Sequence, residues 1–225
     1  DLVGHRGLIE TIRFAKDGRT LLTSGWDRTV RIWDTAGADT EDFGRELACL
    51  TLPGELYSAA LSPDGRQVAA VGMDGLTLWD WSAENEAPRS LENVGACRTA
   101  EFSPDGRVLA LTGSDKVIRL VDPATGRVRS ILGSHDEVVR KMMFTPDSRT
   151  LITLSFDGRM KTWDVVEGRR VERFRGIEDP TRPVLTMALS PSGKDLAVSR
   201  FDDAGRIELW DAASGTLRVV CKTGD

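Results

Sequence analysis

The chain has 225 residues, 40% of them hydrophobic and 29% charged, which is the composition of a folded soluble protein rather than a disordered one. Its net charge is −5 and its Lys and Arg residues are scattered, so no nucleic-acid partner is expected, because such binding clusters cations against phosphates. No run approaches the roughly 18 apolar residues of a membrane-spanning helix, so no membrane partner is expected either.

The three cysteines lie far apart with no paired spacing, which indicates a reducing compartment and predicts a cytoplasmic protein. Together with only two histidines they fall short of a zinc site, and neither a metal nor a cofactor is expected. Cysteines of this kind usually act as small hydrophobic groups, so burial is predicted for all three: Cys49, Cys97 and Cys221.

From the N-terminus onward, one pattern of short strands and turns returns five times at intervals of 41 to 47 residues. In the first repeat, β-branched and apolar residues predict strands over 8–15, 20–24 and 29–34. Asp-Gly pairs suit the tight turns between strands because both residues tolerate positive φ. A fourth, less hydrophobic strand is expected in each repeat, near residues 45–51, 88–93, 127–132, 169–175 and 216–221.

Two features mark every repeat and stay in register along the chain. A turn follows the first strand, at Lys16-Asp17-Gly18, Pro63-Asp64-Gly65, Pro104-Asp105-Gly106, Pro146-Asp147-Ser148 and Pro191-Ser192-Gly193. The third strand ends at Trp33-Asp34, Trp79-Asp80, Val121-Asp122, Trp163-Asp164 and Trp210-Asp211. Such repeats cannot bury their apolar faces alone, so the pattern predicts an all-β array of units stacked in one domain. The predicted units span residues 1–51, 52–93, 94–132, 133–175 and 176–225.

The repeats resemble those of the WD-repeat (β-transducin-type) β-propeller family, through the motifs Gly4-His5, Phe102-Ser103-Pro104-Asp105-Gly106 and Trp33-Asp34. The resemblance covers essentially the whole chain and implies about five four-stranded blades. Because these propellers usually close with seven blades, the chain is expected to be an arc of a larger ring. The alternative is a five-bladed ring, or an arc completed by a partner or a second copy. An open arc would leave two apolar faces bare for self-association or for additional blades of the parent protein.

Two repeats carry His, Thr, Asp and Trp at identical separations of 18, 4 and 6 residues. In the family that the chain resembles, these positions form a hydrogen-bonded chain: the indole donates to Thr, Thr contacts the imidazole, and Asp holds its other nitrogen. The other three repeats depart from the pattern, so their blades are expected to be held by packing. The residues are His5, Thr23, Asp27 and Trp33, and His135, Thr153, Asp157 and Trp163.

The same His, Thr and Asp residues could instead form a catalytic triad. A Thr inside a strand presents no exposed oxygen to a substrate, and no segment resembles a nucleophile elbow. No catalytic residue is therefore predicted, and the chain is expected not to be an enzyme.

The resemblance also implies where partners bind, namely at the top of the propeller. One set of contact positions is the residue before the Asp of the turn that joins the second and third strands. The other set is two residues at the head of each first strand. The first set is Trp26, Met73, Ser114, Phe156 and Phe201. The second is Leu8 and Glu10, Glu55 and Tyr57, Ala96 and Arg98, Val138 and Arg140, Pro183 and Leu185.

Aromatic, Met and Arg side chains of this kind are typical of protein-binding hot spots. The predicted partner-binding residues are therefore Trp26, Tyr57, Met73, Arg98, Arg140, Phe156, Leu185 and Phe201. The alternative is that some of these side chains turn inward, line the central channel of the propeller and pack against neighbouring blades.

These features predict a non-enzymatic scaffold or sensor domain that binds a protein or peptide, with a role in signalling. The Arg-, Gly- and Ala-rich composition resembles that of bacterial WD-repeat proteins, in which propellers are often fused to an effector domain. The alternative function is therefore the propeller part of a larger enzyme whose kinase, protease-like or nucleotide-switch domain lies outside this sequence. A purely structural repeat array differs from both in lacking an exposed top patch.

Overall fold

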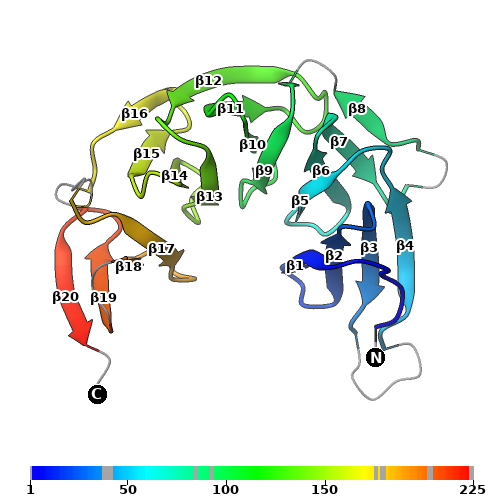
Figure 1. Cartoon of the computed structure of the whole chain (residues 1–225), viewed down its shortest axis with the longest axis horizontal. Coiled ribbons are helices and arrows are strands. Elements are labelled where there is room, and N and C mark those ends of the chain that lie inside the picture. The colour runs from blue at the N-terminus through cyan, green and yellow to red at the C-terminus, as the bar shows by residue number, and fades with distance from the viewer. Residues whose placement is uncertain are drawn as a thin grey trace. The chain divides into compact units, whose positions relative to one another are not determined.

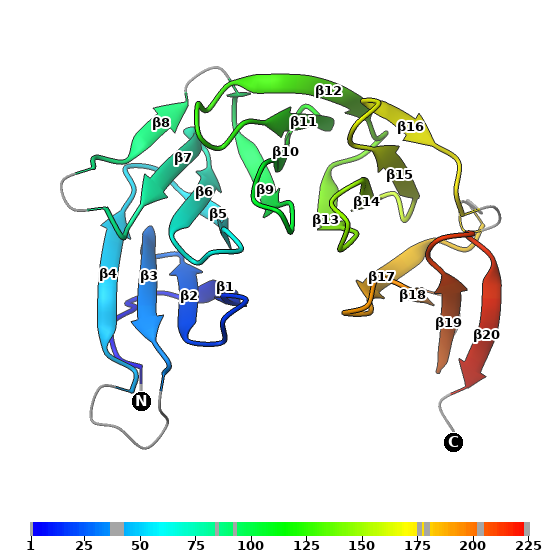
Figure 2. The same cartoon turned by 180° about the vertical axis from the view of Figure 1, so that it is seen from behind.

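The computed structural model describes residues 2–36, 43–83, 86–91, 94–174, 177, 181–201 and 205–222. Across these ranges the strands form five four-stranded antiparallel sheets, each ordered as in the chain, which confirms the all-β class (Figures 1 and 2). No helix in these ranges is long and apolar enough to cross a membrane, and their His, Cys, Asp and Glu residues form no cluster of metal-ligating type. The chain divides into two compact units: residues 1–114 with 120–129, and residues 115–119 with 130–225.

The first two sheets lie in the first unit, and β11 and β12 of the third sheet contribute to both units. The first sheet comprises β1 (Ile9–Phe14), β2 (Thr20–Gly25), β3 (Thr29–Asp34) and β4 (Glu46–Thr51). The second comprises β5 (Leu56–Leu61), β6 (Gln67–Gly72), β7 (Gly75–Asp80) and β8 (Arg89–Leu91). The third comprises β9 (Cys97–Phe102), β10 (Leu109–Gly113), β11 (Val117–Val121) and β12 (Val128–Ser134).

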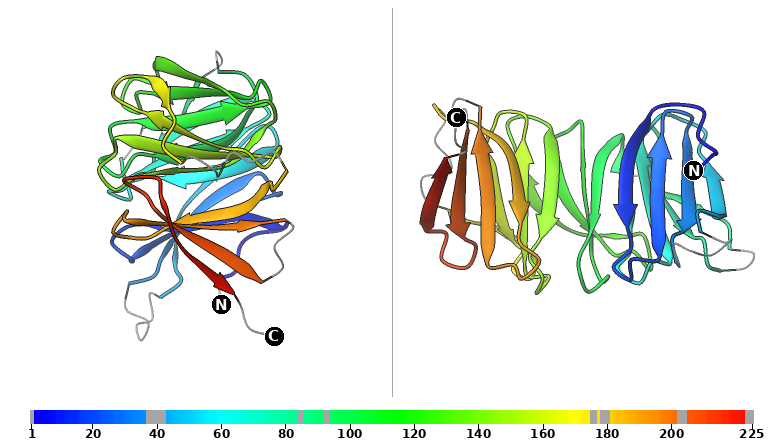
Figure 3. Two further views of the ribbon diagram at one scale, coloured as in Figure 1. Left: turned by 90° about the vertical axis from the view of Figure 1, so that its left-hand side faces the viewer. Right: turned by 90° about the horizontal axis from the view of Figure 1, so that it is seen from below.

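The second unit holds the remaining two sheets, and Figure 3 shows the twist of the last, drawn orange to red. The fourth sheet comprises β13 (Val139–Phe144), β14 (Thr150–Ser155), β15 (Met160–Asp164) and β16 (Arg169–Val171). The fifth comprises β17 (Val184–Leu189), β18 (Asp195–Arg200), β19 (Arg206–Asp211) and β20 (Leu217–Lys222). Strands β8 and β16 are shorter than predicted, and residues 92–93 and 175 of the predicted ranges lie outside the described residues.

Within each unit, neighbouring sheets bury apolar faces against one another, as stacked repeats must. In the first unit, Leu22 and Ile32 of the first sheet pack in one cluster with Val68 of the second. Another cluster joins the second and third sheets, and a further one joins the fourth and fifth sheets of the second unit. These apolar interfaces hold neighbouring sheets together, and the sheets position the loops that connect their strands.

The predicted hydrogen-bonded chain of the first repeat is present in full. The indole Nε1 of Trp33 donates to Thr23 Oγ1 over 2.7 Å, and Thr23 Oγ1 lies 2.7 Å from Nε2 of His5. On its other side, His5 Nδ1 lies 3.0 Å from Oδ2 of Asp27. Burial raises the pKa of Asp27, but bonds from the Arg6 N–H, Thr29 and His5 outweigh it and hold this pKa well below its usual range.

In the fourth sheet the chain stops one link short, which corrects the prediction for Asp157. Trp163 Nε1 donates to Thr153 Oγ1 over 2.8 Å, and His135 Nε2 lies 2.7 Å from the same oxygen. His135 Nδ1 and Asp157 Oδ2, however, are buried without a partner among the described residues. In the first sheet, the hydroxyl of Thr29 contacts both Asp27 and His5. The matching residue in the fourth sheet is Arg159, and its guanidinium pairs with Asp136 rather than bridging to the histidine. This difference is the reason for the missing link.

The buried His135 should make stability fall as pH drops from 6.5 to 4. Burial first, and Lys161 second, lower its pKa to about 4, whereas the ordinary value is 6.5. The unfolded chain therefore takes up the proton first, so the contribution is complete above pH 6.5 and is lost on the way down to pH 4. The expected loss is about 3 kcal/mol in the free energy of unfolding, followed by urea titration across this range. His135→Gln should flatten the slope in this window, and an unchanged slope would contradict the assignment.

The fifth sheet contains a different buried polar chain, which corrects the prediction that packing alone holds it. The indole of Trp210 donates to Glu208 Oε2 over 3.0 Å, and Glu208 Oε1 accepts from Arg200 Nε over 2.8 Å. Arg200 reaches onward to the carbonyl of Arg182 in the preceding loop. A carboxylate and a guanidinium therefore link the Trp to that loop, as Thr and His do elsewhere.

Two further observations concern exposed groups. Ile12 and Phe14 of β1 form an exposed apolar patch, although Ala100 and Phe102 at the matching positions of β9 are buried.

The prediction of buried cysteines is wrong for two of the three, because those two lie on the outermost strands of their sheets, β4 and β20. Cys97 is buried, while Cys49 and Cys221 are exposed.

Candidate functional site

A β-bulge interrupts the pairing of every first strand at the same place. The register of β1 with β2 skips one residue between Ile9 and Thr11, and the other four sheets show the same shift. A bulge adds an unpaired residue and re-aims its side chain. The bulged residues are the second strand-head positions predicted from the sequence: Glu10, Tyr57, Arg98, Arg140 and Leu185.

In each sheet, the residue that follows the second strand donates a backbone hydrogen bond to the head of the first strand. The N–H of Trp26 donates to the Leu8 carbonyl over 2.9 Å, and the N–H of Phe156 donates to that of Val138 over 3.0 Å. Met73, Ser114 and Phe201 make the equivalent bonds to Glu55, Ala96 and Pro183. This bond fixes the backbone of each turn against its own sheet.

The close approach explains the glycine that precedes Trp26 and the glycine that precedes Met73. A Cβ on Gly25 would lie 2.5 Å from the Leu8 carbonyl oxygen, and one on Gly72 would lie 1.9 Å from that of Glu55. Any larger residue at these two positions would push the strand head away from the turn. Glycine therefore fits the close approach in the first two sheets, whereas Ser155 and Arg200 stand at the matching positions of the fourth and fifth sheets, which make the same hydrogen bond.

The large apolar side chains at these turns point into solvent. The exposed fractions are 65% for Trp26, 59% for Met73, 68% for Phe156 and 61% for Phe201. Leu185 and Arg98 are exposed, while Tyr57 and Arg140 are half-buried. We call this set of eight side chains, which coincides with the predicted partner-binding residues, the top residues.

In the first unit, Trp26 pairs with Glu10, which is not a top residue, and the other three top residues form a group. Trp26 Nε1 donates to Oε2 of Glu10 over 3.2 Å. The hydroxyl of Tyr57 lies 3.3 Å from both Met73 Sδ and Glu55 Oε2, and the Arg98 guanidinium lies 4.6 Å from the Tyr57 ring centroid. Glu10 and Glu55 are contact positions implied by the family resemblance, but they were not among the predicted partner-binding residues.

In the second unit, Arg140 connects the top residues of two sheets. Its guanidinium carbon lies 5.8 Å from the ring centroid of Phe156 and 5.9 Å from that of Phe201. Its Nη2 donates to the carbonyl of Val184 over 2.8 Å, and burial lowers its pKa. Arg140, the bulged residue of the fourth sheet, therefore packs beside the exposed ring of Phe201 in the fifth sheet.

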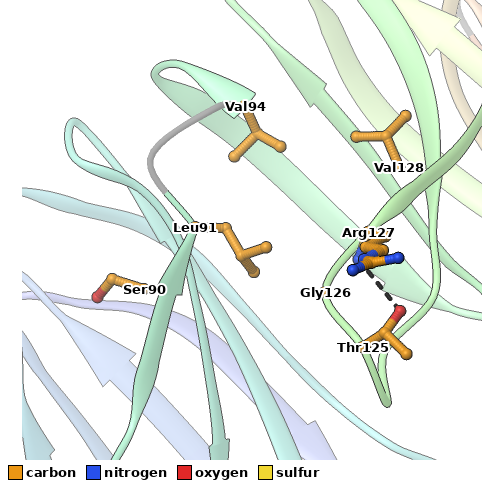
Figure 4. Close-up of a pocket in the computed structure, with 7 residues that line it drawn as sticks. All are labelled: Ser90, Leu91, Val94, Thr125, Gly126, Arg127 and Val128. Atoms are coloured by element: carbon orange, nitrogen blue, oxygen red, sulfur yellow. Dashed lines mark hydrogen bonds between the residues drawn. The ribbon is translucent and has the colours of Figure 1, made fainter.

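A separate groove of about 590 Å³ lies at the outer edge of the first unit, beside β8 and the start of β12 (Figure 4). Arg127 is the one charged residue among the described residues that line it, and its backbone N–H donates to Thr125 Oγ1 over 3.4 Å. The lining residues are Ser90, Leu91, Val94, Thr125, Gly126, Arg127 and Val128.

Comparison with known proteins agrees with the repeat pattern and the fold. The family described as "WD domain, G-beta repeat" matches residues 1–34, 89–122 and 126–164. The solved β-propeller domain of Cps50 (Swd1) from Myceliophteria thermophila superimposes with a TM-score of 0.80 at 17% identity, covering 100% of this chain and 76% of that one. At this identity the likeness concerns the fold alone.

Three curated relatives match along nearly the whole chain. Periodic tryptophan protein 2 of Arabidopsis thaliana is 28% identical over 95% of the chain, and apoptotic protease-activating factor 1 of Danio rerio is 24% identical over 98%. Transcription initiation factor TFIID subunit 5 of Caenorhabditis elegans is 24% identical over 95%. The chain spans 18%, 17% and 32% of their respective lengths. By its repeats, its five four-stranded sheets and these matches, the chain belongs to the WD-repeat β-propeller family.

Proposed function

We propose that this chain is a non-enzymatic interaction scaffold or regulatory domain that binds a protein or peptide through its top residues. The observation that carries the proposal is the fixed exposure of Trp26, Met73, Phe156 and Phe201 on turns that a backbone hydrogen bond pins to each sheet. Large apolar side chains that are exposed and already ordered lose little entropy on binding, so they suit a binding surface.

The alternative that these side chains pack inward would require buried rings, whereas each exposes more than half of its surface. The relatives support a role within assemblies, because one of them is by name a subunit of a transcription initiation factor. Among the described residues, the His and Thr side chains that resemble part of a catalytic triad are hydrogen-bonded to one another within the sheets.

The proposal is tested by measuring affinity for a captured partner after substitution of Trp26 or Phe156 by Ala. We expect each substitution to weaken binding about thirtyfold, or about 2 kcal/mol, because central aromatic anchors dominate interface energies. The melting temperature should stay close to that of the wild type, since both side chains are exposed. Arg129→Ala on β12 is the control and should bind normally. An equal loss in the control would argue against the top residues as the binding surface.

A further inference from the structure

The guanidinium of Arg140 forms no ion pair with another described residue, and two exposed aromatic rings lie close to it. The ring centroids of Phe156 and Phe201 lie at nearly equal distances from the same guanidinium, 5.8 and 5.9 Å from its carbon. Both rings are mostly exposed, while Arg140 itself is half-buried. The cation therefore lies at the surface beside two exposed apolar rings.

The hydrogen-bonding capacity of Arg140 is far from satisfied. Nη2 donates to the Val184 carbonyl, but Nε is buried with no acceptor among the described residues. No carboxylate in these ranges forms an ion pair with Arg140, whereas Arg129, Arg159, Arg200 and Arg218 each have one. Burial without such a partner lowers the pKa of the guanidinium. A partly desolvated cation in this state is stabilised by an anion that reaches it from outside.

The first unit differs, because carboxylates lie beside its top residues. Glu10 accepts the Trp26 indole, and Glu55 lies beside the Tyr57 hydroxyl. These two negative charges disfavour an acidic ligand there. A preference for an anion is thus a property of the Arg140 cluster, which we define as Arg140, Phe156 and Phe201.

We propose that the Arg140 cluster binds an acidic side chain, Glu or Asp, of a partner peptide, with a neighbouring apolar residue packed on the two Phe rings. This inference rests on the proposed function and names the partner class for its second unit. A guanidinium offers a planar set of donors that matches a carboxylate, and flanking rings exclude water and strengthen that contact. A single acidic residue next to an apolar one is the shortest peptide element that satisfies both parts of the cluster.

The experiment is a selection from a displayed library of random short peptides on the whole wild-type chain. We expect the enriched peptides to share Glu or Asp beside a large apolar residue. Selection on Arg140→Gln should lose the acidic preference and keep the apolar one. Arg169→Gln, an exposed arginine on β16 of the same unit, is the matched control and should return the wild-type preference.

A peptide from this selection then gives the affinity, with a substitution on the ligand that cannot disturb the fold. Replacing its acidic residue by Gln or Asn should weaken binding about tenfold on the wild-type chain, and much less on Arg140→Gln, because the charged hydrogen bond is already absent there. Rising salt should weaken only the acidic peptide on the wild-type chain.

The outcomes separate this inference from the function on which it rests. Enriched peptides that are neutral, and that still require Phe156, would overturn the acidic preference while leaving a top-residue binding site in place. Acidic peptides that bind Arg140→Gln and the wild type equally would also overturn it. Enrichment that is indifferent to both Arg140→Gln and Phe156→Ala would contradict the proposed function as well.

Discussion

Replacing Glu208 by Ala should lower the free energy of unfolding by about 3–5 kcal/mol, because it removes the carboxylate that pairs with the buried guanidinium of Arg200 inside the fifth sheet. Arg200 and Glu208 are only 4% and 6% exposed, and two hydrogen bonds of 2.8 and 3.1 Å join them. The same substitution removes the acceptor of the Trp210 indole, which adds an unsatisfied donor. Urea unfolding of the whole chain measures the loss.

A double substitution separates the charge effect from packing. Arg200→Leu with Glu208→Leu removes both charges, so it should cost much less than the sum of the two single changes. Costs that simply add, or a Glu208→Ala loss below about 1 kcal/mol, would contradict a coupled buried pair.

Two phenylalanines at matching positions in the first unit should respond very differently to truncation. Phe102→Ala should cost about 3–5 kcal/mol, whereas Phe14→Ala should change stability by no more than about 0.5 kcal/mol. Each precedes the turn after its first strand, but Phe102 is 6% exposed within the cluster between the second and third sheets. Phe14 is 64% exposed.

The measurement is a comparison of urea midpoints for the two variants under one condition, with sedimentation of each. Phe14→Ala should also reduce any self-association of the wild type, because it removes an exposed apolar side chain. If Phe14→Ala proved as costly as Phe102→Ala, the Phe14 ring would have to be covered in solution.

The strands and turns were predictable because their signals are local. Alternating apolar residues and Asp-Gly turns gave the third strand over 29–34 as observed, and the five Trp-Asp or Val-Asp ends gave the five sheets. Signals that depend on register were not predictable in the same way. In the first sheet Leu21 pairs with Trp33, twelve positions on, whereas in the fifth Leu196 pairs with Trp210, fourteen positions on. Because of those two extra residues, an alignment of the fifth repeat with the first does not show that Glu208 and Arg200 take the places of Thr and His in the hydrogen-bonded chain.

The candidate site was predictable to a similar degree. The contact positions of the family that the chain resembles fall on the bulged residues and on the turns. The identity of their neighbours was not available from that pattern, because the distance of Arg140 from Phe201 depends on how the fourth and fifth sheets pack. The burial of a β1 residue such as Phe14 likewise depends on what lies against its face, which its own sequence does not encode.

The central claim, that partners bind at the top residues, is tested most directly by site-specific photocrosslinking to a captured partner. A photoreactive amino acid would replace Trp26 or Phe156, and Arg129 and Arg169 would carry it as controls on the outer strands β12 and β16. We expect crosslinked partner from the first two positions and none from the controls. Crosslinking from Arg129 and Arg169 with none from Trp26 and Phe156 would contradict the account.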